Sequence, residues 1–401
     1  MPMFSSSINV PVVAACDLEA DAHETFAWYR RSFPFIALDT GGYVVLRHGD
    51  VARLMHDPRL QATEIAMPAQ AGITQGALFD IFAHGMLTAN GEAHARRRSA
   101  VSRALAGQVS EQFRQHMRRA AQGLIEDCYA RGRLELVSGY AEKLPVMALA
   151  SLLGVGDADL LAFMQYVYAM NAFFRPKPTA DQVAAAEAAG SWIRDYLDGL
   201  LADAERGRSH GFLARYAEFA GQERLSRLEA LVQIVQLIIG GTESVRTALV
   251  AQIAHLMTNR DQWRAVCVDP TLVGKAVSEG LRFEPGIAGA IRVSVAEIEI
   301  DGLTLPAGQL VLLSSLSALR DETVFDRPNV FDISRPNLEL SRLVFGGGAH
   351  RCVADVMGRI ELEEALLALV ERLPWLRIDG LPAFHGHMFV RSVGECWVCW
   401  E

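Results

Sequence analysis

The sequence predicts a single, mainly α-helical domain with small β-sheets that spans residues 1–401. Three observations lead to this prediction. Apolar residues recur at helical spacing over most of the chain. Strand-like alternation is confined to a few short runs, and no linker or repeat divides the 401 residues. Hydrophobic residues make up 51% of the chain, enough for an extensive core.

The first half of the chain contains most of the expected helices. They cover residues 21–33, 91–105, 109–131, 138–153, 157–174 and 179–205, and a short strand is expected at 42–47. The last two helices are separated by Arg-Pro-Lys-Pro at 175–178, where two prolines break the helical pattern. We interpret this break as a candidate mobile lid.

The expected strands lie mainly in the second half. Residues 295–313 alternate between apolar and polar and contain Asp301-Gly302, a typical hairpin turn. The tail, Glu-Cys-Trp-Val-Cys-Trp, alternates in the same way. Cys396 and Cys399 have the spacing of half a zinc site, but no second pair accompanies them, and residues three apart in a strand point to opposite faces.

A long helix is expected from Ser226 to Thr258. Ser226 and Glu229 form a capping-box pattern before about 32 residues of helical periodicity, or nearly 50 Å. Gly240 and Gly241 lie in its middle, although each glycine costs roughly 1 kcal/mol there. Either another helix packs closely at this point, or a flat object lies against a face from which Cβ atoms are excluded.

Composition excludes several classes of function. The formal charge of −9 and the pI of about 5.7 argue against nucleic acid as a partner. No uninterrupted apolar run has the roughly 18 residues that cross a bilayer. Six scattered cysteines show no disulfide framework, and the apolar run before Cys16 lacks the basic residues of a signal peptide. We therefore expect a cytoplasmic protein with no membrane partner.

The stretch Phe-Gly-Gly-Gly-Ala-His-Arg-Cys, residues 345–352, carries the strongest chemical signal. Its glycines allow positive φ, and Cys352 precedes a helical run whose N-terminus should favour a thiolate. A phosphate cradle is disfavoured because no Lys-Ser/Thr follows. A catalytic pair with His350 stays open, although the residues suggest no separate base. A thiolate ligand to a metal held by a macrocycle is the strongest interpretation.

These residues resemble the cysteine loop of the cytochromes P450, haem-thiolate monooxygenases, in the soluble bacterial form. The family pattern F-G-x-G-x-H-x-C-x-G is matched by Phe345, Gly346, Gly348, His350 and Cys352, with Ala354 in place of the last glycine. The resemblance implies the cytochrome P450 fold, with a long central helix over the haem and the cysteine-ligand loop beneath it. It also implies haem b, iron protoporphyrin IX, with Cys352 as the thiolate axial ligand.

Other motifs occur in the family's order over most of the chain. His94 and Arg98 match H-x-x-x-R, and Arg292 lies where the family has another haem propionate partner. With His350, the resemblance implies four propionate partners. Glu279 and Arg282 match E-x-x-R, with Arg335 as a third member, and the resemblance makes these structural. By spacing alone, Glu279 and Arg282 would be an ordinary surface pair worth about 0.3 kcal/mol.

The central helix resembles the family's A/G-G-x-D/E-T pattern. Gly240 and Gly241 would then lie over the haem, while Glu243 and Ser244 would handle protons for dioxygen cleavage. The usual threonine is Ser244, which keeps the hydroxyl but loses the methyl that restricts its rotamer. Thr242 could offer a second hydroxyl in a different register.

The resemblance implies a monooxygenase that inserts one oxygen atom from O2 into a small, largely apolar substrate. Electrons would come from a ferredoxin and its NAD(P)H-dependent reductase, and the surface around Arg342 and Arg351 would attract the ferredoxin. Four stretches would line the pocket: 62–86, 163–174, 286–291 and 385–389, with His385 and His387 as candidate polar anchors. A haem-thiolate peroxygenase using hydrogen peroxide and a non-catalytic ligand- or carrier-protein-binding descendant are the alternatives.

Overall fold

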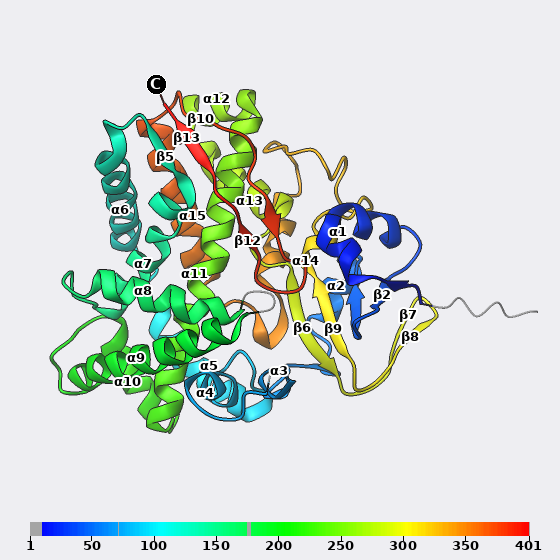
Figure 1. Cartoon of the computed structure of the whole chain (residues 1–401), viewed down its shortest axis with the longest axis horizontal. Helices are drawn as coiled ribbons and strands as arrows, with labels where there is room; N and C mark the ends of the chain where they lie inside the picture. The colour runs from blue at the N-terminus through cyan, green and yellow to red at the C-terminus, as the bar shows by residue number, and fades with distance from the viewer. Residues whose placement is uncertain (1–9, 71, 175–177, 401) are drawn as a thin grey trace, which may run out of the picture.

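The computed structural model describes residues 10–70, 72–174 and 178–400. Figure 1 shows a helix-rich part, which contains α6 to α10, and a sheet-rich part, which contains β1 to β3 and β6 to β9. The long helix α11, Arg227–Thr258, runs through the molecule between them. The predicted fold class, mainly α with small sheets, is confirmed.

The helices preceding α11 cover most of the first half of the chain. Their bounds are α1 Ala15–Arg30, α2 His48–Leu54, α3 Ala66–Gln70, α4 Ala77–Ala83, α5 Gly91–Leu105, α6 Glu111–Tyr129, α7 Lys143–Leu153, α8 Leu160–Asn171, α9 Ala180–Glu205 and α10 Phe212–Gln222. Those after it are α12 Arg260–Val268, α13 Val273–Phe283, α14 Ser315–Ala318 and α15 Asp355–Arg372. Short turns of other helix types are η1 Val137–Ala141, η2 Ala172–Phe174, η3 Pro270–Leu272, η4 Leu338–Phe345 and η5 Gly348–His350.

The strands form one larger sheet and three small ones. The larger sheet has the order β1 (Val12–Val13), β2 (Phe35–Leu38), β3 (Tyr43–Val45), β9 (Leu310–Ser314), β6 (Gly289–Ser294), β4 (Leu60–Gln61). The small sheets are β10 (Arg377–Ile378), β13 (Trp397–Cys399), β5 (Arg133–Glu135); β11 (Phe384–His385), β12 (Ser392–Val393); and β7 (Ile298–Ile300), β8 (Leu303–Leu305). The hairpin at Asp301-Gly302 and the strand in the tail are therefore confirmed.

Most helix predictions hold within a few residues, and the differences have local causes. The helix expected at 138–153 is interrupted, with a π-type turn before α7. Pro145 lies in the first turn of α7, where its missing N–H leaves no helical hydrogen bond unmade. The first helix begins earlier than expected and carries a non-helical residue, Asp21, in its interior. Of the candidate lid at 175–178, residues 175–177 lie outside the described residues.

Helix α11 is the centre of the core. Ser226 and Glu229 form the predicted capping box: Glu229 N–H donates to Ser226 Oγ (3.2 Å) and Ser226 N–H to Glu229 Oε2 (3.0 Å). It is the one helix of the described chain long and apolar enough to cross a membrane, but 61% of its apolar stretch is buried inside the fold. Burial of that kind is typical of a core helix.

Candidate active site

The glycine-rich loop before α15 is shaped by close packing. Gly346 and Gly348 have φ of +73° and +61°, values that favour glycine. A Cβ on Gly348 would lie 2.5 Å from Met55 O at the end of α2, and one on Gly347 would lie 2.9 Å from His56 Nε2. The Cys352 N–H donates to Phe345 O (2.8 Å), which closes the loop. Packing against α2 therefore explains the glycines without a phosphate.

The Cys352 thiol lies in this loop three residues before α15 begins at Asp355. Its side chain is accessible by surface area, yet burial among protein atoms raises the pKa of the thiol. An accessible side chain and a pKa raised by burial are compatible when the sulfur faces a space inside the fold. The Ala354 backbone N–H opposes the rise in pKa but does not overcome it. The backbone N–H at the helix N-terminus thus favours a thiolate, as expected, but in the chain by itself desolvation outweighs its effect on the pKa.

Four basic side chains gather beside the loop: His94, Arg98, Arg292 and His350, which we call the cation cluster. The rings of His94 and His350 are 4.1 Å apart between centroids. Among the described residues, no carboxylate forms an ion pair with any of the four. Arg98 Nη2 donates to Arg351 O (2.6 Å) and Arg292 Nη1 to Ile291 O (2.8 Å), both neutral acceptors.

The cation cluster shows the electrostatic signature of an anion site. Burial lowers the pKa of Arg292, and burial followed by the charges of Arg98 and Arg292 lowers that of His94. Burial and the same neighbours lower the pKa of His350 to about 3. His94 Nε2 is buried without a hydrogen-bond partner in the described chain. Mutually repelling groups of this kind are stable together when an anion binds between them.

Gly240 and Gly241 lie in an unbroken stretch of α11. A Cβ on Gly240 would meet nothing within 4 Å, and one on Gly241 would make only ordinary contact, 3.6 Å, with Leu149. Close helix packing therefore does not explain these glycines. The close approach to this part of α11 comes from Gly286, where a Cβ would lie 2.2 Å from Ser244 O.

The acid and the alcohol on this helix have different environments. Glu243 pairs with Arg246 one turn later, and Arg246 Nη1 also donates to Glu142 (2.7 Å). Ser244 Oγ donates to Gly240 O (2.9 Å), so the hydroxyl lies one turn back along the helix. Thr242 is fully buried, donates to Ile238 O (3.0 Å) and accepts from Asn171 Nδ2 (2.6 Å). Thr242 therefore does not supply a second hydroxyl beside Ser244, because its hydroxyl bonds Asn171 and Ile238 O.

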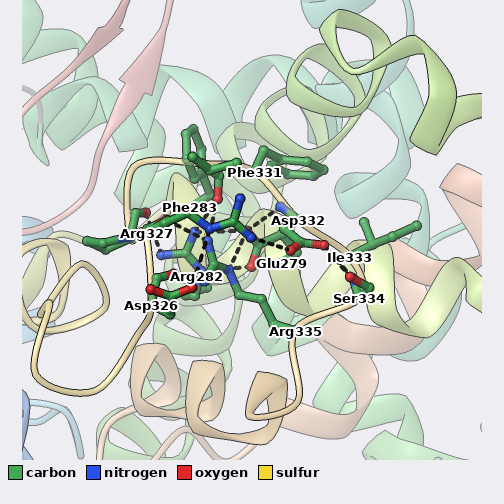
Figure 2. Close-up of polar contacts among 12 residues, drawn as sticks. Glu279, Arg282, Phe283, Asp326, Arg327, Phe331, Asp332, Ile333, Ser334 and Arg335 are labelled. Atoms are coloured by element: carbon green, nitrogen blue, oxygen red, sulfur yellow. Dashed lines mark hydrogen bonds and ion pairs between the residues drawn. The ribbon is translucent and has the colours of Figure 1, made fainter.

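A fully buried ion cluster supports the turn that leads to the cysteine loop. Arg282 donates to both carboxylate oxygens of Glu279, at 2.7 and 2.8 Å, and Arg335 Nε adds a third contact at 3.2 Å. Figure 2 shows the two guanidinium groups converging on Glu279 beside the chain at 326–335. Both side chains of the Glu279–Arg282 pair are 0% exposed, so the surface-pair interpretation is wrong.

The four stretches expected to line the pocket all approach α11. Asn171 contacts Thr242, Gly286 lies against Ser244, and Met86 N–H donates to Gln233 Oε1 (2.7 Å). A small cavity is lined by Asn171, Phe174, Glu243, His385, Val390, Arg391 and Ser392. His385 is therefore close to Glu243. His387 is buried, and burial lowers its pKa.

Known proteins are similar to this one over nearly the whole chain. Residues 270–391 match the family model described as cytochrome P450. A plant-inducible protein of Rhizobium radiobacter, cytochrome P450-pinF1, is 33% identical over 98% of this chain and 94% of its own length. Nocardicin C N-oxygenase of Nocardia uniformis subsp. tsuyamanensis is 30% identical over 89% of each chain. The chain belongs to the cytochrome P450 family.

Solved cytochrome P450 structures agree in fold. The crystal structure of CalO2 superposes with a TM-score of 0.88 at 25% identity and covers 96% of this chain and 97% of its own. P450BioI in complex with an acyl carrier protein ligated to hexadec-9Z-enoic acid has a TM-score of 0.86, at 21% identity over 96% and 100% of the two chains. The cytochrome P450 described here is accordingly a haem-thiolate monooxygenase whose cofactor is haem b.

Sequence reasoning missed several residues of this P450's distal side. Arg246 follows Glu243 at helical i, i+3 spacing, a signal that was available. Glu142 directly precedes α7, and Asn171 is the last residue of α8. No pattern in the sequence connects either residue to α11. Two of the three buried glutamines of α11, Gln233 and Gln236, were also missed.

Proposed function

We propose that this cytochrome P450 inserts one oxygen atom of O2 into a small, largely apolar organic substrate. The other oxygen atom leaves as water, and the reaction consumes two electrons and two protons. The observation that carries this proposal is the position of Glu243 and Ser244 on the same turns of α11 as Gly240, where Ser244 Oγ donates to Gly240 O. An acid and a hydroxyl beside the oxygen-binding face are what proton delivery to bound O2 requires.

Cys352 is the proposed axial ligand, and the residues around it fit a haem. A thiolate donates electron density that favours cleavage of the O–O bond when haem is bound. The four residues of the cation cluster would bind the two propionates, which supply the anions that this cluster otherwise lacks. Phe345 and Gly346 shape the loop that would hold the thiolate ligand of the haem. Gly240 and Gly241 present a surface without side chains that could lie against the haem.

Glu243 and Ser244 are the proposed proton-handling residues. Ser244 would hold a proton donor close to the oxygen-binding position, and its hydroxyl is oriented by Gly240 O. Glu243 is buried beside Arg246, which pairs with Glu142 as well, so the carboxylate is connected to a polar network. Because serine lacks the methyl of threonine, its rotamer is less restricted, and we expect some loss of coupling between electron use and product formation.

Electrons are proposed to come from a ferredoxin and its NAD(P)H-dependent reductase in the cytoplasm. Arg342 and Arg351 flank the cysteine loop, are 49% and 43% exposed, and share the single carboxylate of Asp355, at 3.1 and 2.6 Å. Two cations on one acid leave a net positive surface for an acidic partner. All six cysteines are free, as a reducing compartment requires.

The substrate class is proposed from the residues near the distal face. Phe82, Phe173 and Phe174 form an aromatic cluster with centroid distances of 5.2 to 6.2 Å. Apolar walls of this kind bind apolar ligands, with orientation set by a few polar groups. His385 and Asn171, which line one cavity with Glu243, are candidates for such groups. Relatives named for oxygenation of nocardicin C and for hydroxylation or epoxidation of mycinamicin IV indicate natural-product intermediates as a class to screen first.

The first experiment is the reduced, carbon monoxide-bound absorption spectrum, followed by turnover with two oxidants. We expect the red-shifted Soret band of a thiolate-bound haem and its loss in Cys352→His. Ser244→Ala should lower product formed per NAD(P)H with O2, while turnover driven by hydrogen peroxide stays near the wild-type rate. The matched control is Thr242→Val, which removes the neighbouring hydroxyl that faces Asn171 and should leave coupling unchanged.

Equal product yield per NAD(P)H in Ser244→Ala and wild type would contradict the proposed proton role of Ser244. Turnover with hydrogen peroxide alone, and none with O2 and reduced ferredoxin, would favour a peroxygenase.

A further inference from the structure

Glu284, directly after α13, is buried and lies among four basic side chains from distant parts of the chain. Arg391, between β11 and β12, pairs with its Oε1, and His23 Nε2 of α1 lies 3.2 Å from the same oxygen. His255 Nε2 of α11 and Arg320 Nη2 each lie 3.7 Å from Oε2. We call these five residues the Glu284 cluster. One carboxylate therefore joins α1, α11 and the C-terminal tail.

A second histidine of the tail, His387, lies at the same interface. It is buried, and the charged groups that act on it are Glu19 of α1, which favours its protonation, and Arg391, which opposes it. Arg391 Nε also donates to Gly386 O (3.0 Å), so the guanidinium that pairs with the central carboxylate also fixes the turn that carries His387. The contact between α1 and the tail thus includes two histidines, His23 from α1 and His387 from the tail.

The hydrogen bonding of His23 fits a neutral ring. Its Nε2–H donates to Glu284, because a carboxylate can only accept. Its Nδ1 is buried and has no hydrogen-bond partner among the described residues. A proton on Nδ1 would therefore create a buried N–H donor without an acceptor, which is unfavourable.

Burial and the surrounding charges also oppose protonation of the two histidines. Burial lowers the pKa of His23, and Arg320 and Arg391 add to this effect against the opposing influence of Glu284. Burial lowers the pKa of His387 as well. A histidine of this kind costs no stability above its ordinary pKa of about 6.5, and it destabilises the folded arrangement as the pH falls below that value. Acid therefore acts on α1 and the tail at the point where they meet.

We propose that the Glu284 cluster and His387 form an acid-sensitive clasp, which holds α1 against the C-terminal tail and releases it when His23 and His387 take up protons. Arg391 also lines the cavity beside Glu243, so release of the tail changes the distal side of the site as well. The clasp thus makes the packing of the N-terminal helix and of this cavity depend on pH.

The release is local, because α1 is held at a second place. Arg30, at the end of the helix, donates to Ser317 O (3.0 Å) and to Arg320 O (2.7 Å), and these bonds do not involve a histidine. The non-helical residue Asp21 interrupts α1 two positions before His23. The helix bends at this interruption while its end stays attached, so the movement is reversible.

The test uses the haem-loaded enzyme and follows hydrogen exchange of the backbone amides by mass spectrometry at about pH 7.5 and about pH 5.5, on either side of the ordinary histidine pKa. Exchange is corrected for its intrinsic pH dependence, and α6, which contributes no residue to the clasp, is the internal reference. In the wild type we expect residues 19–26 to lose protection at the lower pH while α6 keeps it. Protection should return when the pH is raised again.

Two substitutions separate the histidines from the rest of the fold. His23→Gln retains an N–H donor for Glu284 but cannot take up a proton, and it should reduce the loss of protection. His387→Gln should reduce the loss independently, and the double variant should show none. The matched control is His210→Gln, at an exposed histidine, which should behave like the wild type.

Equal protection of residues 19–26 at both pH values in the wild type would overturn the proposal. A loss of protection that α6 shares would also overturn it, because acid would then be unfolding the whole protein. The same holds for a loss in the double variant as large as that in the wild type, since the two histidines would then not be the groups that respond to acid.

Discussion

Two groups of charged residues flank the cysteine loop, one of them buried and the other mostly half-buried, and they are built in opposite ways. In the first, Glu279 receives Arg282 and Arg335, and the remaining guanidinium N–H groups donate to backbone carbonyls such as Leu319 O. In the second, the cation cluster, four basic groups have no carboxylate in ion-pair contact within the described chain. The charges of the first group are neutralised within the protein, and those of the second group are neutralised only when an external anion binds.

The difference separates a structural role from a binding role. Charges that are paired and hydrogen-bonded have their cost of burial offset inside the fold, so their removal affects folding. Charges that repel one another lower each other's pKa, as His94 and His350 show, and their removal affects ligand binding. This contrast supports a scaffold role for Glu279, Arg282 and Arg335 and the proposed haem-binding role for His94, Arg98, Arg292 and His350.

The largest effect is expected from breaking the self-neutralised group. Glu279→Gln leaves Arg282 and Arg335 buried without a counter-charge, and we expect a loss of about 3–5 kcal/mol in the free energy of unfolding. Chemical denaturation of the apoprotein measures this loss. The matched control is Asp261→Asn, which breaks another i, i+3 pair with arginine whose side chains are 97% and 69% exposed. A similar loss in both variants would show that burial does not distinguish the two pairs.

The next effect concerns the cation cluster. Arg292→Met removes a half-buried charge with no acidic partner among the described residues, so the apoprotein should be as stable as the wild type or more stable. The holoprotein should lose haem about tenfold faster or more, since a charge-assisted hydrogen bond is worth about 1.5–3 kcal/mol. Haem transfer to an acceptor protein measures the rate.

Arg320→Met provides the contrast for Arg292→Met. Arg320 is buried, but its guanidinium donates to Phe283 O (2.7 Å) and to Asn329 Oδ1 (3.1 Å), so its loss should destabilise the apoprotein. If Arg292→Met destabilises the apoprotein as much as Arg320→Met does, the cation cluster is structural after all.

Much of this site was predictable because local chemistry dictates it. The capping box at Ser226 fixes the start of α11, and the order of glycine, histidine and cysteine before α15 identifies the ligand loop. Residue spacing could not reveal burial, so the i, i+3 spacing of Glu279 and Arg282 alone predicted a surface pair, although both side chains are buried. It also could not reveal contacts between distant segments, such as Gln236 with Leu87 or Arg246 with Glu142, because glutamine and glutamate carry no positional signal of their partners.

The smallest effect comes from a third kind of buried charge, an acid without a cation. Glu361 on α15 is buried, its Oε2 has no hydrogen-bond partner in the described chain, and burial raises its pKa to about 8. Between pH 4.5 and 8 the folded protein therefore holds a proton that the unfolded chain releases, so the free energy of unfolding falls as pH rises through this window. Glu361→Gln removes that dependence, so the variant should match the wild type at low pH and be more stable than the wild type at pH 8.

Glu364, on the same helix, is the buried glutamate with cationic partners to which Glu361 is compared. It is also buried, but Arg114 and Arg118 donate to its two oxygens at 2.7 and 2.8 Å. Glu364→Gln should therefore lower stability at neutral pH, where Glu361→Gln raises it, because the first substitution removes a paired charge and the second removes a carboxyl group that must take up a proton to be buried. Unfolding curves of both variants between pH 5 and 8 decide the matter. If the two substitutions shift stability in the same direction across that range, pairing within the fold is not what separates structural charges from the rest.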